Sequence, residues 1–371
     1  MVLDDVKNIK VFVLLLLIFC YVIILVYKVF NGVTIIVVKD NGDSINITAG
    51  LIADALPKSM SSEPTTPPEL PKCPEVPPNL IGPLATYRDG PEFEEIAKKN
   101  PGLRKGGLFS PPDCKARHKV AIVIPFRNRS EHLHTLVHNL HPFLSKQQLE
   151  YGIYVIDQAP PGHFNRAMLM NIGYIESMKR HDYGCTVFHD VDLVPENDKN
   201  IYSCTDNPRH LSCAIDKYDY ELHYPGIAGG VTAVRKDVFE KMNGYSNLYF
   251  GWGGEDDDLA FRMTDNGYKI VRYPMEIARY KMLSHGFRNE TGNKPNPLRY
   301  KLLNNVTARA PNDGIHNMAP YTVNTVEELP THTRIEVFID EEEVMKGWNI
   351  GPPLDDELEK KLREKINPKK P

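Results

Sequence analysis

The feature that most constrains the fold is an alternation of short apolar segments with helix-like segments in the middle of the chain. Residues 120–125, 151–157 and 185–189 are short and apolar, which is typical of buried strands. Residues 130–144 and 165–179, which lie between them, carry apolar side chains at helical spacing. This strand–helix–strand–helix–strand order predicts a parallel sheet with helices on its faces. Ligands of such sheets bind beyond the carboxyl ends of the strands.

Charged residues stand at those predicted strand ends. Arg127 and Arg129 follow the first strand, and Asp190 and Asp192 follow the third. In extended backbone, residues i and i+2 point to the same face, so we expect the two carboxylates to converge, which suits a divalent cation that bridges a diphosphate. Neither a G-x-G-x-x-G loop nor a Walker loop follows the first strand. The two arginines are therefore candidates to bind phosphate, and the alternative for them is a solvated surface loop.

A run of four consecutive carboxylates, residues 255–258, follows the segment Gly251-Trp252-Gly253-Gly254. One interpretation is the N-terminus of a helix, where the helix dipole favours negative charge. The other is a sugar or metal site, because glycines let the backbone approach a ligand, an indole offers a stacking face and a carboxylate can act as a base. The run alone does not decide between them.

The two ends of the chain differ from its middle. Residues 11–27 are apolar and uncharged. We expect a membrane anchor over 11–30 and a cytoplasmic tail over 1–10, rather than a cleaved signal peptide, because no small-residue cleavage site follows. Residues 31–72 include a proline-rich stretch, which predicts an extended stem. Residues 346–371 are rich in charges of both signs and are predicted to be an exposed tail, to which we assign no function.

Charge and cysteine content exclude two kinds of site. A formal net charge of −4 gives no electrostatic footprint for nucleic acid, so we exclude that partner. None of the six cysteines forms a C-x-x-C pair, so a zinc site is not expected. A lumenal compartment permits disulfides, and the pairing we prefer is Cys73–Cys114 with Cys185–Cys204, which leaves Cys213 over. Sequons that would accept glycan in a lumenal domain begin at Asn46, Asn289 and Asn305.

Six motifs occur along the chain in a fixed order. They are Phe126-Arg-Asn-Arg129, Phe164-Asn-Arg166, Asp190-Val-Asp192, Gly229-Gly-Val231, Trp252-Gly-Gly-Glu-Asp-Asp-Asp258 and Asn296-Pro-Leu-Arg-Tyr300. Together they resemble the β-1,4-galactosyltransferase family, glycosyltransferase family 7, over about residues 73 to 340. The resemblance implies one α/β catalytic domain of the GT-A type over 73–345, with a Rossmann-like mixed sheet and flanking helices. It also implies a type II Golgi membrane protein with a lumenal catalytic domain, a UDP-sugar donor, manganese, and inversion at the transferred sugar.

The resemblance implies roles for residues around the metal and the donor. Asp192, Met282 and His285 match the family's manganese ligands. Spacing alone favours a core methionine at 282 and a surface histidine at 285, and the resemblance outweighs that interpretation. Trp252 matches the indole of a mobile loop that closes on the donor. The other positions that match those around the UDP-sugar are Pro125, Phe126, Arg127, Arg129, Phe164, Arg166, Asp190 and Val191.

The resemblance also implies a base and an acceptor pocket. Asp256 matches the catalytic base, which takes the proton from the acceptor 4-hydroxyl. Tyr300 stands where many members have phenylalanine. Gly254 stands where relatives that act on xylose tend to have arginine, and this favours N-acetylglucosamine (GlcNAc) as the acceptor. The positions that match the acceptor pocket are Tyr224, Gly254, Glu255, Asp256, Asp257, Arg299 and Tyr300.

One departure from the family concerns the donor. Ile227 stands where vertebrate galactosyltransferases have tyrosine, at a position that faces the C2 group of the donor sugar. Tyrosine restricts the space for an N-acetyl group, and an aliphatic residue removes that restriction. Members with isoleucine here are invertebrate β-1,4-N-acetylgalactosaminyltransferases. The resemblance therefore implies UDP-GalNAc as donor and GalNAcβ1-4GlcNAc as product. If Ile227 is neutral packing instead, the donor is UDP-Gal.

A different class of function is a non-catalytic glycan-binding protein on the same fold. That class predicts loss of the base or of the metal ligands, and this chain retains Asp256, Asp192, Met282 and His285. We therefore expect an enzyme. The sequence leaves open whether the acceptor is a glycolipid, an N-glycan or both, and whether a homodimer or a helper membrane protein forms.

Overall fold

The computed structural model describes residues 69–284 and 294–366. The predicted cytoplasmic tail and anchor, the predicted stem up to residue 68, and His285 lie outside the described residues. Within the described ranges, no helix is both long enough and apolar enough to cross a membrane.

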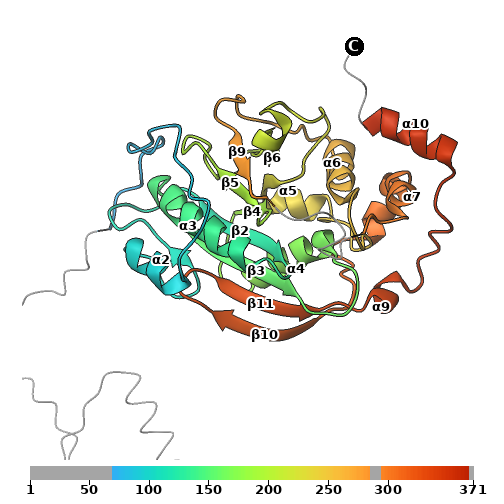
Figure 1. The fold of residues 1–371 in the computed structure, drawn as a ribbon, viewed down its shortest axis with the longest axis horizontal. Coiled ribbons are helices and arrows are strands. Elements are labelled where there is room, and N and C mark those ends of the chain that lie inside the picture. The colour runs from blue at the N-terminus through green and yellow to red at the C-terminus, as the bar shows by residue number, and fades with distance from the viewer. Residues whose placement is uncertain (1–68, 285–293, 367–371) are drawn as a thin grey trace, which may run out of the picture. The chain divides into compact units, whose positions relative to one another are not determined.

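The core of the fold is an eight-stranded mixed sheet (Figure 1). Its strands are β1 (Leu108–Phe109), β2 (Lys119–Phe126), β3 (Glu150–Gln158), β4 (Cys185–His189), β6 (Arg209–His210), β8 (Val231–Arg235), β10 (Thr322–Glu328) and β11 (Thr333–Phe338). The order across the sheet is β10-β11-β3-β2-β4-β8-β6, and β1 pairs with β3. β11, β3, β2 and β4 pair in parallel, whereas β1, β6, β8 and β10 pair antiparallel with their neighbours. The three predicted strands and the mixed sheet are confirmed.

Two helices cover opposite faces of this sheet. They are α3 (Ser130–Lys146) and α4 (Arg166–Met178), both close to the predicted bounds. Because side chains alternate along a strand, Ile122 of β2 packs in the cluster that contains α3, and its neighbour Val123 packs in the cluster that contains α4. The close approach of α4 requires Gly173, where an added Cβ would lie 2.2 Å from Val123 Cγ1.

The strands of a second, three-stranded sheet alternate in the sequence with later strands of the main sheet. This second sheet holds β5 (Leu193–Pro195), β7 (Ala214–Ile215) and β9 (Arg279–Met282) in the order β5-β9-β7. The remaining helices are α2 (Phe93–Lys99), η1 (Asp216–Tyr218), α5 (Lys236–Lys241), α6 (Glu255–Asp265), α7 (Arg299–Leu303), α8 (Val306–Arg309), η2 (Ala310–Asn312), α9 (Glu341–Met345) and α10 (Asp356–Ile366). α10 lies in the charged segment predicted to be exposed, but its Leu362 is buried.

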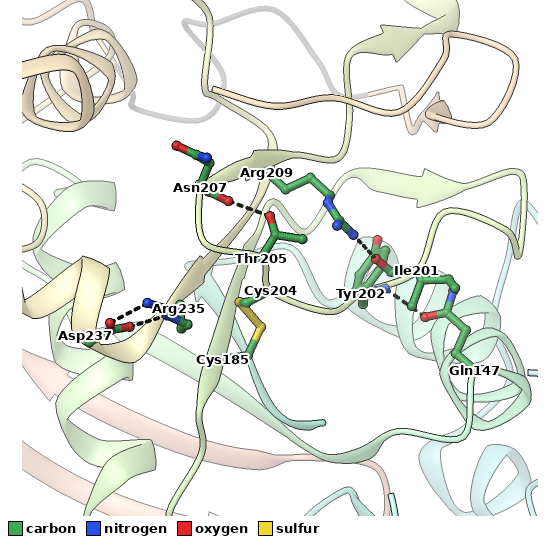
Figure 2. Close-up of a disulfide and its surroundings, with 10 residues drawn as sticks. All are labelled: Gln147, Cys185, Ile201, Tyr202, Cys204, Thr205, Asn207, Arg209, Arg235 and Asp237. Atoms are coloured by element: carbon green, nitrogen blue, oxygen red, sulfur yellow. Dashed lines mark hydrogen bonds and ion pairs between the residues drawn. A yellow bond between two sulfur atoms is a disulfide. The ribbon is translucent and has the colours of Figure 1, made fainter. Parts of the chain in front are cut away.

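Both preferred disulfides are confirmed. Cys73–Cys114 joins the start of the described chain to the segment before β2, and Cys185–Cys204 joins the first residue of β4 to the segment after β5. Figure 2 shows the second bond beside Tyr202, whose backbone N–H donates to the Gln147 side chain. Among the described residues, Cys213 is free and buried.

Candidate active site

The parallel strands β2, β3 and β4 end at one edge of the sheet, and the predicted donor residues follow these ends. Arg127, directly after β2, donates to the Gly162 carbonyl oxygen at 3.0 Å and lies 5.2 Å from the centroid of the Phe164 ring. Arg129 lies 3.6 Å from the Asp192 carboxylate. Phe126 and Val191, which are neighbours of these residues in the sequence, are buried. The two arginines therefore stand at the sheet edge rather than on a remote surface.

Asp190 and Asp192 do not lie in extended backbone, so this part of the prediction is wrong. Asp190 donates its backbone N–H to Gly230 O at 3.1 Å, and its own carbonyl accepts from Leu193 N at 3.4 Å. This turn reverses the chain between β4 and β5, because β5 leaves the main sheet to pair with β9. The two carboxylates consequently have different ion-pair partners, Arg166 for Asp190 at 2.7 Å and Arg129 for Asp192.

Burial raises the pKa of Asp190 to about 6. The charge of Arg166 opposes this rise, and the charge of Asp192 adds to it. Two carboxylates that repel each other in a partly buried turn are a favourable place for a cation.

Strand pairing brings the backbone of Met282 next to that of Asp192, two of the three predicted metal ligands. Met282 pairs with Leu193 across β9 and β5, and Leu283 N donates to Asp192 O at 2.7 Å. Met282 is half-buried, and its backbone is further held by a hydrogen bond to Asp216 at 2.8 Å. The third predicted ligand, His285, is outside the described residues. Over 69–284 and 294–366, no group of three or more His, Cys, Asp or Glu side chains is arranged to hold a metal.

The acidic run forms the first turn of α6, so the prediction of a helix start is confirmed. Gly254 caps the helix with a positive φ of 95°, a conformation that favours glycine. Glu255 faces Arg166 at 3.6 Å. Burial, and then the charge of Asp256, raise the pKa of Glu255 to about 7.

Asp256 lies against the glycine segment before β8. A Cβ added to Gly229 would lie 2.3 Å from Asp256 Oδ2, so only glycine leaves room for the carboxylate there. The other carboxylate oxygen accepts from Asp257 N at 3.0 Å. The sequence motif contained Gly229, but its contact with the predicted base could not be inferred from the pattern.

Asp257 and Asp258 face opposite environments. Tyr224 Oη donates to Asp257 at 2.7 Å, and burial followed by the charge of Asp256 raises the pKa of Asp257 to about 8. Asp258 is fully buried and forms ion pairs with Arg262 and Arg309. These two arginines hold the pKa of Asp258 below its usual range despite its burial. The run thus contains acceptor-side and purely structural carboxylates.

The predicted acceptor residues of α7 lie next to the cap of α6. A Cβ added to Gly254 would lie 3.2 Å from Arg299 Cβ, and Arg299 lies 4.7 Å from the centroid of the Tyr300 ring. Trp252 is 43% exposed, and its backbone pairs with the segment around Asn296, whose N–H donates to Trp252 O at 3.0 Å. These contacts gather the predicted acceptor residues around the start of α6.

Ile227 ends a turn whose backbone is held by hydrogen bonds from a residue outside the turn. Its N–H donates to Tyr224 O at 3.2 Å, and Arg272 donates to its carbonyl oxygen at 2.7 Å and to that of Pro225 at 2.9 Å. Arg272 also donates to His210 at 3.2 Å. Sequence reasoning missed Arg272, because no motif links it to a residue 45 positions earlier.

Two cavities open elsewhere on the domain. One of about 480 Å³ is lined by residues of α7 and α8 and by 348–350, and one of about 130 Å³ lies beside Phe250 and residues 294–298. Neither is lined by Asp190, Asp192 or Asp256. The carboxylate and arginine geometry, rather than cavity size, therefore identifies the candidate site.

Comparisons with known proteins identify the family of this chain. The family sequence model described as the N-terminal region of glycosyl transferase group 7 matches residues 73–205, and the model described as the N-terminal domain of galactosyltransferase matches residues 209–286. Beta-1,4-galactosyltransferase 1 of Mus musculus is 46% identical over 271 residues, which cover 73% of this chain and 67% of that protein. Beta-1,4-galactosyltransferase 2 of Cricetulus griseus is 42% identical over 297 residues, 79% of each chain. The catalytic domain of Drosophila beta1,4-galactosyltransferase 7, solved with xylobiose, is 30% identical with a TM-score of 0.49, over 60% of this chain and 94% of that one.

Site and sequence together define a glycosyltransferase. The chain belongs to glycosyltransferase family 7, the family of the β-1,4-galactosyltransferases.

Proposed function

We propose that this chain transfers GalNAc from UDP-GalNAc to the 4-hydroxyl of a terminal β-linked GlcNAc, with inversion, to form GalNAcβ1-4GlcNAc. Family membership supports β-1,4-glycosyl transfer, and the names of the curated relatives fit a galactose donor as well. The observation that carries the choice of GalNAc is Ile227. The alternative is a β-1,4-galactosyltransferase that uses UDP-Gal on the same acceptor.

Asp256 is the proposed base. Its carboxylate stands at the N-terminus of α6 against Gly229, and Tyr224 and Asp257 form a hydrogen-bonded pair beside it. The raised pKa values of Glu255 and Asp257 favour their protonated forms near neutral pH, which lowers the negative charge around Asp256. Asp256 takes the proton from the acceptor hydroxyl as that oxygen attacks C1 of the donor sugar.

Asp192, Met282 and His285 are the residues that would hold Mn²⁺. A carboxylate with a thioether and an imidazole is a softer set than magnesium prefers, and the β5–β9 pairing supports this proposal because it brings the backbone of Met282 next to that of Asp192. When bound, the ion supplies positive charge that neutralises the departing diphosphate. Arg127 and Arg129 offer planar donors to the phosphate oxygens from the end of β2.

The donor is selected by the side chain at position 227, because the backbone at this position is held in place. Arg272 and the turn from Tyr224 hold the backbone of Ile227, so the side chain at this position sets the space beside the donor. Isoleucine lacks the ring and hydroxyl that would oppose a C2 N-acetyl group. The half-buried Ile227 side chain is compatible with contact to a bound sugar.

A donor comparison tests the proposal. The purified protein is assayed with UDP-GalNAc and UDP-Gal on a GlcNAc-terminated acceptor with Mn²⁺. We expect kcat/KM to favour UDP-GalNAc, and Ile227→Tyr to shift the ratio toward UDP-Gal by about tenfold or more. Ile227→Val, which keeps a small aliphatic side chain, is the control and should leave the ratio near wild type. A wild-type preference for UDP-Gal would contradict the proposed donor and support the alternative.

We also propose a type II Golgi membrane protein with its catalytic domain in the lumen. The apolar run over residues 11–27 supports an anchor, and two disulfides support an oxidising compartment. The acceptor would be carried on a glycolipid, an N-glycan or both. A homodimer or a helper membrane protein is left open.

A further inference from the structure

The C-terminal helix α10 reaches two elements that carry proposed acceptor residues (Figure 1). Its Leu362 is 8% exposed and packs with Leu303 of α7 and Val306 of α8. One turn later, at the end of α10, the Ile366 carbonyl oxygen would lie 3.9 Å from a Cβ added to Gly226. Gly226 belongs to the turn that Tyr224 begins. α10 therefore extends from α7 to this turn.

The polar side chains of α10 meet the acceptor pocket at Tyr300. The Arg363 guanidinium lies 4.9 Å from the centroid of the Tyr300 ring, and Arg363 also forms an ion pair with Glu359 one turn earlier. The hydrogen bond with Glu359 is the largest influence that raises the pKa of Arg363, and the side chain of Tyr300 adds to it. Arg363 is thus positioned by its own helix and by a proposed acceptor residue.

We propose that α10 forms an outer wall of the acceptor cleft and that Arg363, with Glu359 and Tyr300, binds the sugar that precedes the terminal GlcNAc. This rests on the proposed acceptor, and it extends the site by one sugar unit. No residue outside the described ranges takes part.

The chemistry of the wall indicates a neutral sugar. Arg363 offers only hydrogen-bond donors and Glu359 only acceptors, and their charges offset each other. Such a pair satisfies hydroxyl groups, which both donate and accept, better than it satisfies a free anion. The Arg363 side chain is 53% exposed and the Glu359 side chain 26%, so both are accessible to a ligand.

The test compares acceptors that differ by one sugar. The full-length protein is assayed with the methyl β-glycoside of GlcNAc and with the disaccharide GlcNAcβ1-4GlcNAc, at a saturating concentration of its preferred donor. We expect the wild-type kcat/KM to favour the disaccharide. Arg363→Ala should lower that preference about three- to tenfold, through the acceptor KM, because one hydrogen-bonding group is lost. The donor KM should not change.

Lys361→Ala is the matched control. Lys361 lies on the same helix and pairs with Glu357 at 2.7 Å, away from Tyr300. Glu359→Gln, which retains the size and an acceptor oxygen, should have a smaller effect than Arg363→Ala. An unchanged preference in Arg363→Ala, or an equal loss in Lys361→Ala, would overturn the inference and leave the proposed function intact. No transfer by the wild type to either sugar would overturn both.

Discussion

Neighbouring carboxylates in the first turn of α6 have opposite pKa shifts because they face different surroundings. Two arginines neutralise Asp258 and lower its pKa, whereas burial and Asp256 raise the pKa of Asp257 to about 8. Asp257 has only the Tyr224 hydroxyl as its hydrogen-bond donor from another side chain among the described contacts. An acceptor sugar that donates a hydroxyl would relieve this position. Before the sugar binds, we expect Asp257 to reduce stability.

Asp257→Asn tests that expectation through pH. The unfolded side chain loses its proton near its ordinary pKa of 3.8, but the folded one keeps it until about pH 8. The folded state therefore binds more protons in this window, and the free energy of unfolding falls as pH rises from about 4 to about 8. The asparagine variant lacks this titration. Thermal unfolding without ligands should show it gaining stability over the wild type as pH increases.

The control for that measurement is the exposed Glu364→Gln. The difference in unfolding temperature between this variant and the wild type should be the same at every pH. If the difference in unfolding temperature between Asp257→Asn and the wild type were also the same at every pH, Asp257 would not titrate in this window. Asp257→Asn should also lose transfer to GlcNAc, so that stability and acceptor binding change in opposite directions.

At the scale of elements, a buried ion network joins α6 to α8 and η2. Asp258 pairs with Arg262 at 2.6 Å and with Arg309, and both arginines contact Asp313. All four side chains are at most 3% exposed. This network anchors the helix whose first turn holds the proposed base.

Asp258→Asn should destabilise the domain by about 3–5 kcal/mol, because it leaves two buried guanidinium groups to share the carboxylate of Asp313. Urea unfolding measures the loss. Asp265→Asn at the other end of α6 is the matched control, since Asp265 is exposed and its carboxylate accepts a hydrogen bond from the Thr307 hydroxyl at 2.7 Å. A cost below about 1 kcal/mol for Asp258→Asn would show that the network does not anchor α6.

Elements with strong local patterns could be predicted, and those that depend on distant pairing could not. β2, β3, β4, α3 and α4 have apolar periodicity, and so they appear in the sequence with nearly correct bounds. β10 is exposed along its whole length, and β6 and β7 have two residues each, so they carry no such pattern. β6 and β7 depend on pairing with the distant strands β8 and β9, whereas β10 pairs with the next strand, β11, and lacks a pattern because it is exposed throughout.

The same distinction holds within the candidate site. Residues in contiguous motifs, such as Asp192 and Asp256, could be proposed from the sequence. The turn at Asp190 could not be predicted, because it depends on β5 leaving the main sheet for β9. Likewise, the Arg272 side chain donates to the backbone carbonyl of Ile227 in another loop, and no residue pattern encodes this contact.

At the scale of the whole domain, the two disulfides differ in what they enclose. Cys73–Cys114 has a sequence separation of 41 and closes a segment at the start of the domain, away from the carboxylates. Cys185–Cys204 has a separation of 19 and encloses Asp192 in its loop. Because loop closure limits the unfolded chain, loss of the first should cost about 4 kcal/mol and loss of the second about 3 kcal/mol.

The bond that contributes less to stability, Cys185–Cys204, should matter more for activity. In each variant, both cysteines of one pair are replaced by serine. We expect the Cys73/Cys114 variant to reach its half-maximal rate at the same Mn²⁺ concentration as the wild type. The Cys185/Cys204 variant should need more Mn²⁺, because the turn that carries Asp192 then has one fewer constraint between β4 and the segment after β5. Titration with Mn²⁺ below the unfolding temperature of both variants measures this. Equal requirements in the two variants would mean that β5–β9 pairing alone positions Asp192.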